Sequence, residues 1–213
     1  ALAFGKRTAM LEKWDLDGNY ELLYRDLTEV RVSAWGQSQF IDNAGCQFNQ
    51  VMAVINGVVD MCPNTRLIRQ YMKDVRTGAQ RIDASSQNGT FQPLAFINTD
   101  GGYVVVVKAG GSGSFSVNGL PAGTYARSYA TGTEMQNLSD VTIGAGQAVS
   151  FAIPDAGVAT ISARIVSPPP PPGSPPAGGA ALTYLGQTFQ KVSEGQSLTS
   201  DGDQDAGFAV TLP

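Results

Sequence analysis

Residues 94–107, Leu94-Ala95-Phe96-Ile97-Asn98-Thr99-Asp100-Gly101-Gly102-Tyr103-Val104-Val105-Val106-Val107, decide the fold, because two apolar runs flank one polar, glycine-rich turn. Short runs rich in β-branched and aromatic residues predict strands, and Asn, Asp and Gly between them predict the turn. The unbroken run of four valines predicts a central strand that is covered on both of its faces.

The same pattern recurs along residues 79–166, which we expect to be all-β. Short apolar segments alternate there with turn signals such as Asn118-Gly119 and Pro121-Ala122-Gly123. The expected strands cover residues 94–97, 103–108, 115–117, 125–129, 149–153 and 158–164. This spacing of short strands predicts an antiparallel β-sandwich, to which we assign residues 87–166.

Residues 1–86 have an α/β pattern. The stretch from Gly5 to Glu12 is a short strand that ends on a carboxylate, which is how parallel α/β barrels present catalytic groups. A helix is expected over residues 20–29, with Leu22, Leu23, Leu27 and Val30 on one face, followed by a strand over residues 30–35. Two such βα units cannot bury their faces alone, so we expect a partial (β/α) barrel remnant.

A second helix is expected after Pro63, with Asn64 as its cap and apolar residues continuing to Val75. This helix should pack on the sandwich and bury Tyr71 and Met72, because residues 1–86 supply too little core of their own.

The composition changes at residue 167. Residues 167–179 hold a proline tract and a Gly/Ala hinge, typical of a polyproline II linker. Residues 180–213 contain two strand-like pieces, 182–192 and 207–212, which are too few to fold alone. We expect them to pair with neighbouring copies of the chain or with a following domain. The expected fold class is thus α+β and multidomain: barrel remnant, sandwich, linker and short β tail.

Charge and composition exclude several classes of function. A net charge of −4 with a pI near 4.7 argues against nucleic acid and anionic membrane surfaces as partners. No apolar run is long enough to span a membrane. Histidine is absent, which removes imidazole acid–base chemistry and most zinc or copper sites. The alternating acids near Asp15 and Asp203 lack the glycine or closing glutamate of a calcium loop, so we expect no metal and no cofactor.

Two cysteines and two sequons bear on the compartment. Cys46 and Cys62 are either two buried thiols or a disulfide that closes a loop of about 15 residues and contributes roughly 3 kcal/mol. Asn88 and Asn137 each begin an N-glycosylation tripeptide, which we expect in turn-like contexts. The sequons and the proline tract together favour an extracellular glycoprotein, and export in turn favours the disulfide.

Four stretches, residues 6–12, 32–35, 67–82 and 94–105, resemble the end of retaining glycoside hydrolases of the (β/α)8 clan, of the glucosylceramidase and endo-galactanase/xylanase type. The resemblance implies that Glu12 is the nucleophile and that Trp35 lines a sugar subsite. The family's acid/base residue lies on the fourth barrel strand, outside the matching region, so this chain alone should not be catalytic. Resemblance to wall glycoproteins further suggests hydroxylation or O-glycosylation at Ser167, Pro168, Pro169, Pro170, Pro171 and Pro172.

These observations support two hypotheses about function. The first is an exported glycoprotein of hydrolase ancestry that serves as a structural or assembly component of an extracellular fibre or cell wall. The alternative is a C-terminal fragment of an active retaining endo-glycanase that acts on cell-wall polysaccharide. A carbohydrate-binding role for residues 87–166 has less support, because no cluster of exposed aromatics is evident.

Overall fold

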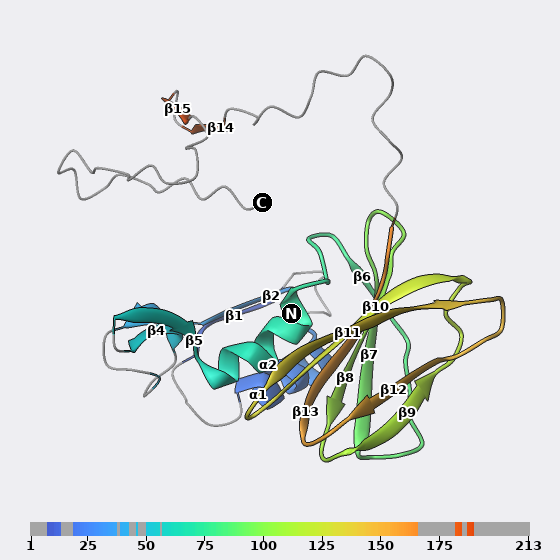
Figure 1. Cartoon of the computed structure of the whole chain (residues 1–213). Coiled ribbons are helices and arrows are strands. Elements are labelled where there is room, and N and C mark those ends of the chain that lie inside the picture. The colour runs from blue at the N-terminus through green and yellow to red at the C-terminus, as the bar shows by residue number, and fades with distance from the viewer. Residues whose placement is uncertain are drawn as a thin grey trace. The chain divides into compact units, whose positions relative to one another are not determined.

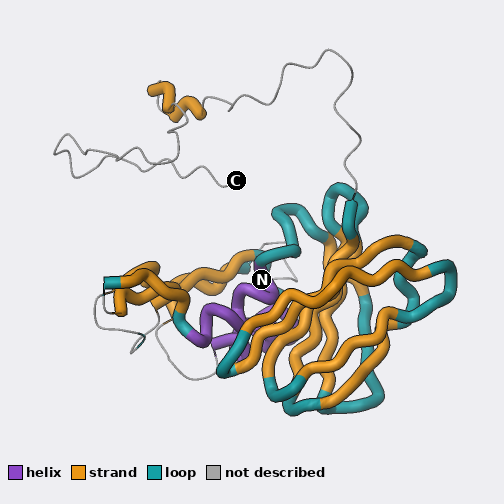
Figure 2. Tube along the Cα trace, viewed as in Figure 1, coloured by secondary structure: helices purple, strands orange, loops and turns teal. Residues whose placement is uncertain are grey.

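The computed structural model describes residues 8–13, 19–37, 39–42, 46, 50–55, 57–165, 182–184 and 187–189. The chain divides into two compact units, residues 1–166 and residues 167–213. The described part is mostly β-strand with two α-helices (Figures 1 and 2). Neither helix is long and apolar enough to cross a membrane.

An antiparallel β-sandwich dominates the first unit, which confirms the expected sandwich. Its larger sheet has the strand order β11-β10-β13-β8-β7-β6. These strands are β6 (Gln80–Ile82), β7 (Phe91–Ile97), β8 (Tyr103–Ala109), β10 (Gly123–Thr131), β11 (Met135–Ile143) and β13 (Gly157–Ala163). A second sheet of β9 (Gly113–Val117) and β12 (Val149–Ile153) packs on its inner face and shares one hydrophobic core with it.

The valine strand β8 lies inside the larger sheet and is covered on both faces, as expected. Val105 and Val107 face the core between the two sheets. Val104 and Val106 face a second apolar cluster, which α2 completes on the outer side of the sheet. Because successive side chains of a strand point to opposite faces, a run of four valines serves two cores at once.

Helix α2 (Pro63–Met72) covers the outer face of the larger sheet through Leu67, Ile68 and Tyr71. The expected packing of this helix on the sandwich is therefore confirmed, and Tyr71 is 4% exposed. The expected burial of Met72 is wrong, because its side chain lies at the rim of a pocket and is 45% exposed. Asn64 is not the cap: the helix begins at Pro63, a position where proline lacks only an N–H that would be unpaired anyway.

The first half of the unit begins with β1 (Ala9–Lys13) and α1 (Asn19–Arg25). A π-helical segment, η2 (Asp26–Val30), extends α1 until Arg31, whose backbone is left-handed. The strand expected over residues 30–35 therefore starts later, as β2 (Ala34–Gln37). The wider π turn also rotates Val30 off the face of Leu23 and Leu27, and Val30 is 48% exposed instead of buried.

A small lobe that the sequence did not suggest follows β2. It is a three-stranded sheet of β3 (Gln39–Asp42), β4 (Gln50–Ile55) and β5 (Val58–Met61). A disulfide between Cys46 and Cys62, with 5.5 Å between the Cα atoms, ties the lobe to the start of α2. The expected bridge is thus confirmed.

In the second unit the described residues form one antiparallel hairpin. It consists of β14 (Leu182–Tyr184) and β15 (Gln187–Phe189). The expectation of a single strand over 182–192 is wrong, because residues 182–184 pair antiparallel with residues 187–189. The proline tract from Ser167 and the tail strand 207–212 lie outside the described residues.

Candidate active site

The candidate nucleophile Glu12 is the penultimate residue of β1, which pairs in parallel with β2. Met10 lies opposite Trp35 and Lys13 lies opposite Gln37, with an irregularity in the register between the two pairs. In parallel α/β folds the carboxyl ends of neighbouring strands form one edge, where functional groups gather. The backbone of Glu12 is placed at such an edge, whereas its side chain lies outside what the structure describes.

Trp35 in β2 contacts the helices. Its indole Nε1–H donates a hydrogen bond of 3.2 Å to Oδ2 of Asp26. The Asp26 side chain is only 2% exposed, so the indole satisfies a carboxylate that burial would otherwise penalise. The ring also packs against the cluster between α1, α2 and the sheet. These are the contacts of a core residue, and a role of Trp35 in sugar binding stays a prediction.

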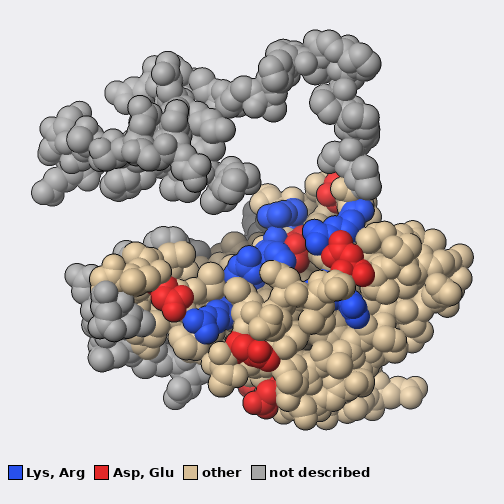
Figure 3. Space-filling model, viewed as in Figure 1, with Lys and Arg blue, Asp and Glu red and all other residues tan. Residues whose placement is uncertain are grey.

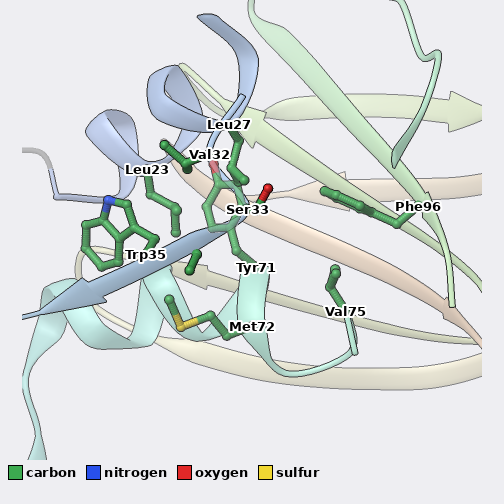
Figure 4. Close-up of a pocket in the computed structure, with 10 residues that line it drawn as sticks. Leu23, Leu27, Val32, Ser33, Trp35, Tyr71, Met72, Val75 and Phe96 are labelled. Carbon is green, nitrogen blue, oxygen red and sulfur yellow. The ribbon is translucent and has the colours of Figure 1, made fainter. Parts of the chain in front are cut away.

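A shallow apolar pocket of about 190 Å³ lies beside Trp35. Figure 4 shows Leu23 and Trp35 near Tyr71 and Met72 of α2, with Phe96 of the sandwich close by. The hydroxyl of Tyr71 is buried and has no hydrogen-bond partner among the described residues. Burial raises the pKa of this phenol well above its usual value of 10.0, which favours its neutral form.

Buried polar contacts fix α2 on the sheet. Ser128 donates from Oγ to Oε1 of Gln70 at 2.9 Å, and Thr160 donates from Oγ1 to the backbone oxygen of Gln70 at 2.7 Å. All three side chains are buried. These contacts fix the position and rotation of α2 on the larger sheet. The residue pattern does not reveal these contacts, because a glutamine between apolar residues also fits an exposed position.

Charged side chains of both signs are mixed on the surface (Figure 3). Lys108 forms an ion pair of 3.7 Å with Glu21 and lies over the ring of Tyr24, and so links β8 to α1. Arg164 forms two hydrogen bonds to Asp140, at 2.9 and 3.0 Å. Among the described residues no group of three potential metal ligands comes together.

The expected modification sites are exposed where they are described. Asn88 lies in a turn, and its Oδ1 accepts a hydrogen bond from the Thr90 N–H. Asn137 lies within β11, opposite Ser128, and not in a turn as expected. Exposure is compatible with glycosylation at both, which stays a prediction. The candidate positions from Ser167 to Pro172 lie outside the described residues.

One protein-family model matches part of the chain. Residues 78–170 match the model described as the glycosyl hydrolase family 30 beta sandwich domain. No curated protein compared with the chain matches it.

Solved structures extend the likeness beyond the sandwich. The catalytic domain of GH30 xylanase C from Talaromyces cellulolyticus is 19% identical with a TM-score of 0.61, over 75% of this chain and 41% of that one. A GH30 endoxylanase from Clostridium papyrosolvens C71 is 15% identical with a TM-score of 0.60, over 76% and 43%. A conserved exported protein from Bacteroides fragilis is 14% identical with a TM-score of 0.53, over 67% and 32%.

The chain therefore spans less than half the length of these structures, and at such identities the likeness shows the fold alone. Residues 78–170 thus match the glycosyl hydrolase family 30 beta sandwich domain, and about three quarters of the chain is similar in fold to part of two GH30 xylanases.

Proposed function

We propose that residues 1–166 form the last strands and the side domain of an exported retaining glycan hydrolase, with Glu12 as its nucleophile. One observation carries the proposal: Glu12 lies near the carboxyl end of β1, in parallel with β2, and α2 joins this pair to a family 30 sandwich. Because two similar structures are xylanases, β-linked cell-wall polysaccharide of the xylan kind is the proposed substrate class.

The chemistry assigns one role to this chain and leaves another open. In retaining hydrolysis one carboxylate attacks the anomeric carbon while a second carboxylic acid protonates the leaving oxygen, and the two carboxyl groups lie about 5–5.5 Å apart. Water then hydrolyses the glycosyl-enzyme and releases the sugar. Strands β1 and β2 carry a single carboxylate between them, Glu12. The proton donor must come from another part of the barrel, so we expect no turnover by these 213 residues alone.

Export is part of the proposal. The Cys46–Cys62 disulfide suits an oxidising compartment. The similar protein from Bacteroides fragilis is described as an exported protein. Both sequon asparagines are exposed, as attachment of an N-glycan requires.

Covalent trapping tests the assignment of Glu12. The natural protein, of whatever length, is incubated with a 2-deoxy-2-fluoro xylobioside that carries a good leaving group, which traps the glycosyl-enzyme of a retaining enzyme. Peptide mapping is expected to find the sugar on Glu12. Glu12→Gln should abolish labelling and hydrolysis, whereas Glu21→Gln, which removes an exposed carboxylate on α1, should retain both. Label on another residue, or turnover by Glu12→Gln, would refute the role.

The structural role expected from the sequence is the second candidate. Its support is the proline-rich segment from Ser167 and the tail behind it. Pairing of β14 with β15 removes one of the strands that were expected to seek a partner. Intact mass of the natural protein separates the candidates: about 22.3 kDa plus glycans excludes a complete hydrolase and supports a structural component. Hydroxyproline or O-glycans at positions 167–172 would add to the structural candidate.

A further inference from the structure

We infer that Asp26 is a positioning residue for the candidate nucleophile Glu12. It fixes the register in which β2 pairs with β1, and that register sets how the backbone of Glu12 is presented. The inference rests on the proposed function, because it assigns Asp26 to the reaction that Glu12 would perform. It is carried by an irregular connection between α1 and β2, a buried carboxylate that closes this connection, and an irregularity in the strand pairing at Glu12.

The connection between α1 and β2 has an unusual backbone. Helix α1 continues into the five-residue π turn η2. Arg31 ends this turn with a φ of 55°, and it is the only non-glycine residue with a positive φ in the described part of the chain. π turns and left-handed non-glycine residues are both uncommon, and both are often found at functional sites. Other contacts must hold such a connection in place.

Asp26 closes this connection with both its backbone and its side chain. Its backbone oxygen accepts hydrogen bonds from the N–H of Arg31 and, at 3.1 Å, from the N–H of Val32. Its Oδ2 accepts the indole N–H of Trp35 in β2. Because a buried carboxylate without a partner is costly, the hydrogen bond to Trp35 is strongly favoured. One residue thus joins the end of the helix to β2.

The same connection is also attached to β1. The N–H of Ser33 donates to the backbone oxygen of Thr8 at 2.7 Å, and the Thr8 hydroxyl donates to the backbone oxygen of Arg31 at 3.3 Å. Thr8 immediately precedes β1. The start of β2 therefore cannot shift along β1 without breaking both contacts.

The pairing of the two strands becomes irregular at Glu12. Met10 lies opposite Trp35 and the next pair is Lys13 opposite Gln37, so β1 advances by three residues while β2 advances by two. Glu12 lies inside this stretch. An extra residue in one strand bends that strand and re-aims its side chains, and such irregularities are over-represented beside active sites. A shift at Trp35 would therefore change the presentation of Glu12.

A small displacement of a nucleophile is enough to slow its reaction. The reacting atoms must come within about 3–3.5 Å, and a misplacement of about 1 Å can cost roughly a hundredfold in rate. Asp26 is buried and acts through Trp35 and the backbone. We therefore expect its loss to slow the attack by Glu12 without weakening the binding of the sugar.

The rate of covalent trapping at Glu12 measures this attack directly, because the carboxylate bonds to the anomeric carbon as the leaving group departs. The natural protein and its variants are incubated with the 2-deoxy-2-fluoro xylobioside over a range of concentrations, and label on Glu12 is followed by mass spectrometry. Asp26→Leu should lower the maximal labelling rate at least about tenfold and change the half-saturating concentration less than about twofold. Asp26→Asn keeps an oxygen that accepts the indole N–H, so its maximal rate should stay within about threefold.

Two comparisons separate this role from a general loss of stability. Tyr125→Phe removes a hydrogen bond of 2.7 Å to the Pro121 oxygen in the sandwich and should leave both labelling parameters unchanged. Trp35→Phe removes the donor of the Asp26 contact. Combined with Asp26→Leu, it should slow labelling no further than the slower single variant, because both act through one hydrogen bond. Circular dichroism checks that each variant is folded under the assay conditions.

Hydrogen exchange tests the constraint without any substrate. Amides of residues 34–37 in β2 should exchange about tenfold faster in Asp26→Leu than in the unsubstituted protein, because the connection that holds the strand is opened. Amides of residues 103–109 in β8 should not change. If Asp26→Leu does not fold, Trp35→Phe takes its place in both measurements.

Each opposing result overturns the inference in a distinct way. No label, or label on a residue other than Glu12, refutes the proposed function together with the inference. Label on Glu12 at an unchanged rate in Asp26→Leu, or unchanged exchange in β2, refutes the positioning role alone. A higher half-saturating concentration at an unchanged maximal rate assigns Asp26 to sugar binding. An equal loss of rate in Tyr125→Phe assigns the effect to stability.

Discussion

Replacing Trp35 with phenylalanine tests whether its main role is to satisfy a buried carboxylate. The change keeps an aromatic ring in β2 but removes the Nε1–H that donates to Asp26 at 3.2 Å. A hydrogen bond to a charged group contributes about 1.5–3 kcal/mol, and the smaller ring also loses apolar contact. We expect Trp35→Phe to lower the free energy of unfolding by about 3 kcal/mol.

Urea unfolding followed by circular dichroism measures this loss without relying on tryptophan fluorescence. A double-mutant cycle isolates the contact, with Trp35→Phe, Asp26→Leu and the pair. Trp35→Phe alone leaves the Asp26 carboxylate, which is 2% exposed, without its hydrogen-bond donor. The double variant removes the carboxylate as well, so no buried charge is left unpaired. The coupling energy should therefore be at least about 1.5 kcal/mol.

Tyr129→Phe is the matched control, because it removes a hydroxyl that donates to Glu134 at 2.8 Å in a partly exposed position. It should cost no more than about 1 kcal/mol. Additive effects of Trp35→Phe and Asp26→Leu, or a cost of Trp35→Phe no larger than that of the control, would refute the buried-contact explanation.

Three further predictions concern the sandwich and its helix. Gly157→Ala should destabilise by about 3 kcal/mol in urea unfolding, because an added Cβ would overlap the carbonyl oxygen of Ala130 on the paired strand. Tyr71→Phe should leave stability unchanged or raise it by about 1 kcal/mol in the same assay, since the hydroxyl it removes is buried and has no hydrogen-bond partner in the described part of the chain. The hydrogen bond from Arg164 holds the pKa of Asp140 below its ordinary value of 3.8, so the stabilising contribution of the pair is present at neutral pH and is lost as the pH falls through the lowered pKa. Carboxyl NMR titration should show that pKa rising in Arg164→Gln.

Each of these three predictions has a control or a result that would contradict it. Gly132→Ala introduces a Cβ into open space and should be nearly neutral. Tyr125→Phe loses a hydrogen bond of 2.7 Å to the Pro121 oxygen and should cost about 1 kcal/mol, unlike Tyr71→Phe. An Asp140 titration that Arg164→Gln does not move would contradict the third prediction.

Strands with an apolar face could be predicted from the sequence, and polar ones could not. Alternation reveals β12, and continuous apolar character reveals β8. Strand β11 was missed because its residues are mostly exposed or half-buried at the edge of the sheet, where backbone pairing and not side-chain burial defines the strand. The end of α1 was misplaced because a π turn has no hydrophobic period of its own.

Fewer features of the candidate site than of the fold could be predicted from the sequence. Glu12 came from its place at the end of a strand and from resemblance. Asp26 and Gln70 did not emerge, because a polar residue reads the same in sequence whether it is solvated or buried with a partner. Spacing alone left the state of Cys46 and Cys62 undecided, and only the signs of export favoured the bridge that the structure contains.

The two-faced strand β8 has a consequence for where this protein can be divided. The family boundary falls at residue 78, after α2 has ended. A fragment that begins there would lack Leu67, Ile68 and Tyr71, and would expose to solvent the apolar surface that they cover, including Val104 and Val106. The sandwich is thus not a portable module of the kind that recombines freely among secreted enzymes. Recombination that preserves folding has to carry α2 along, which makes the helix and the sandwich a single unit of inheritance.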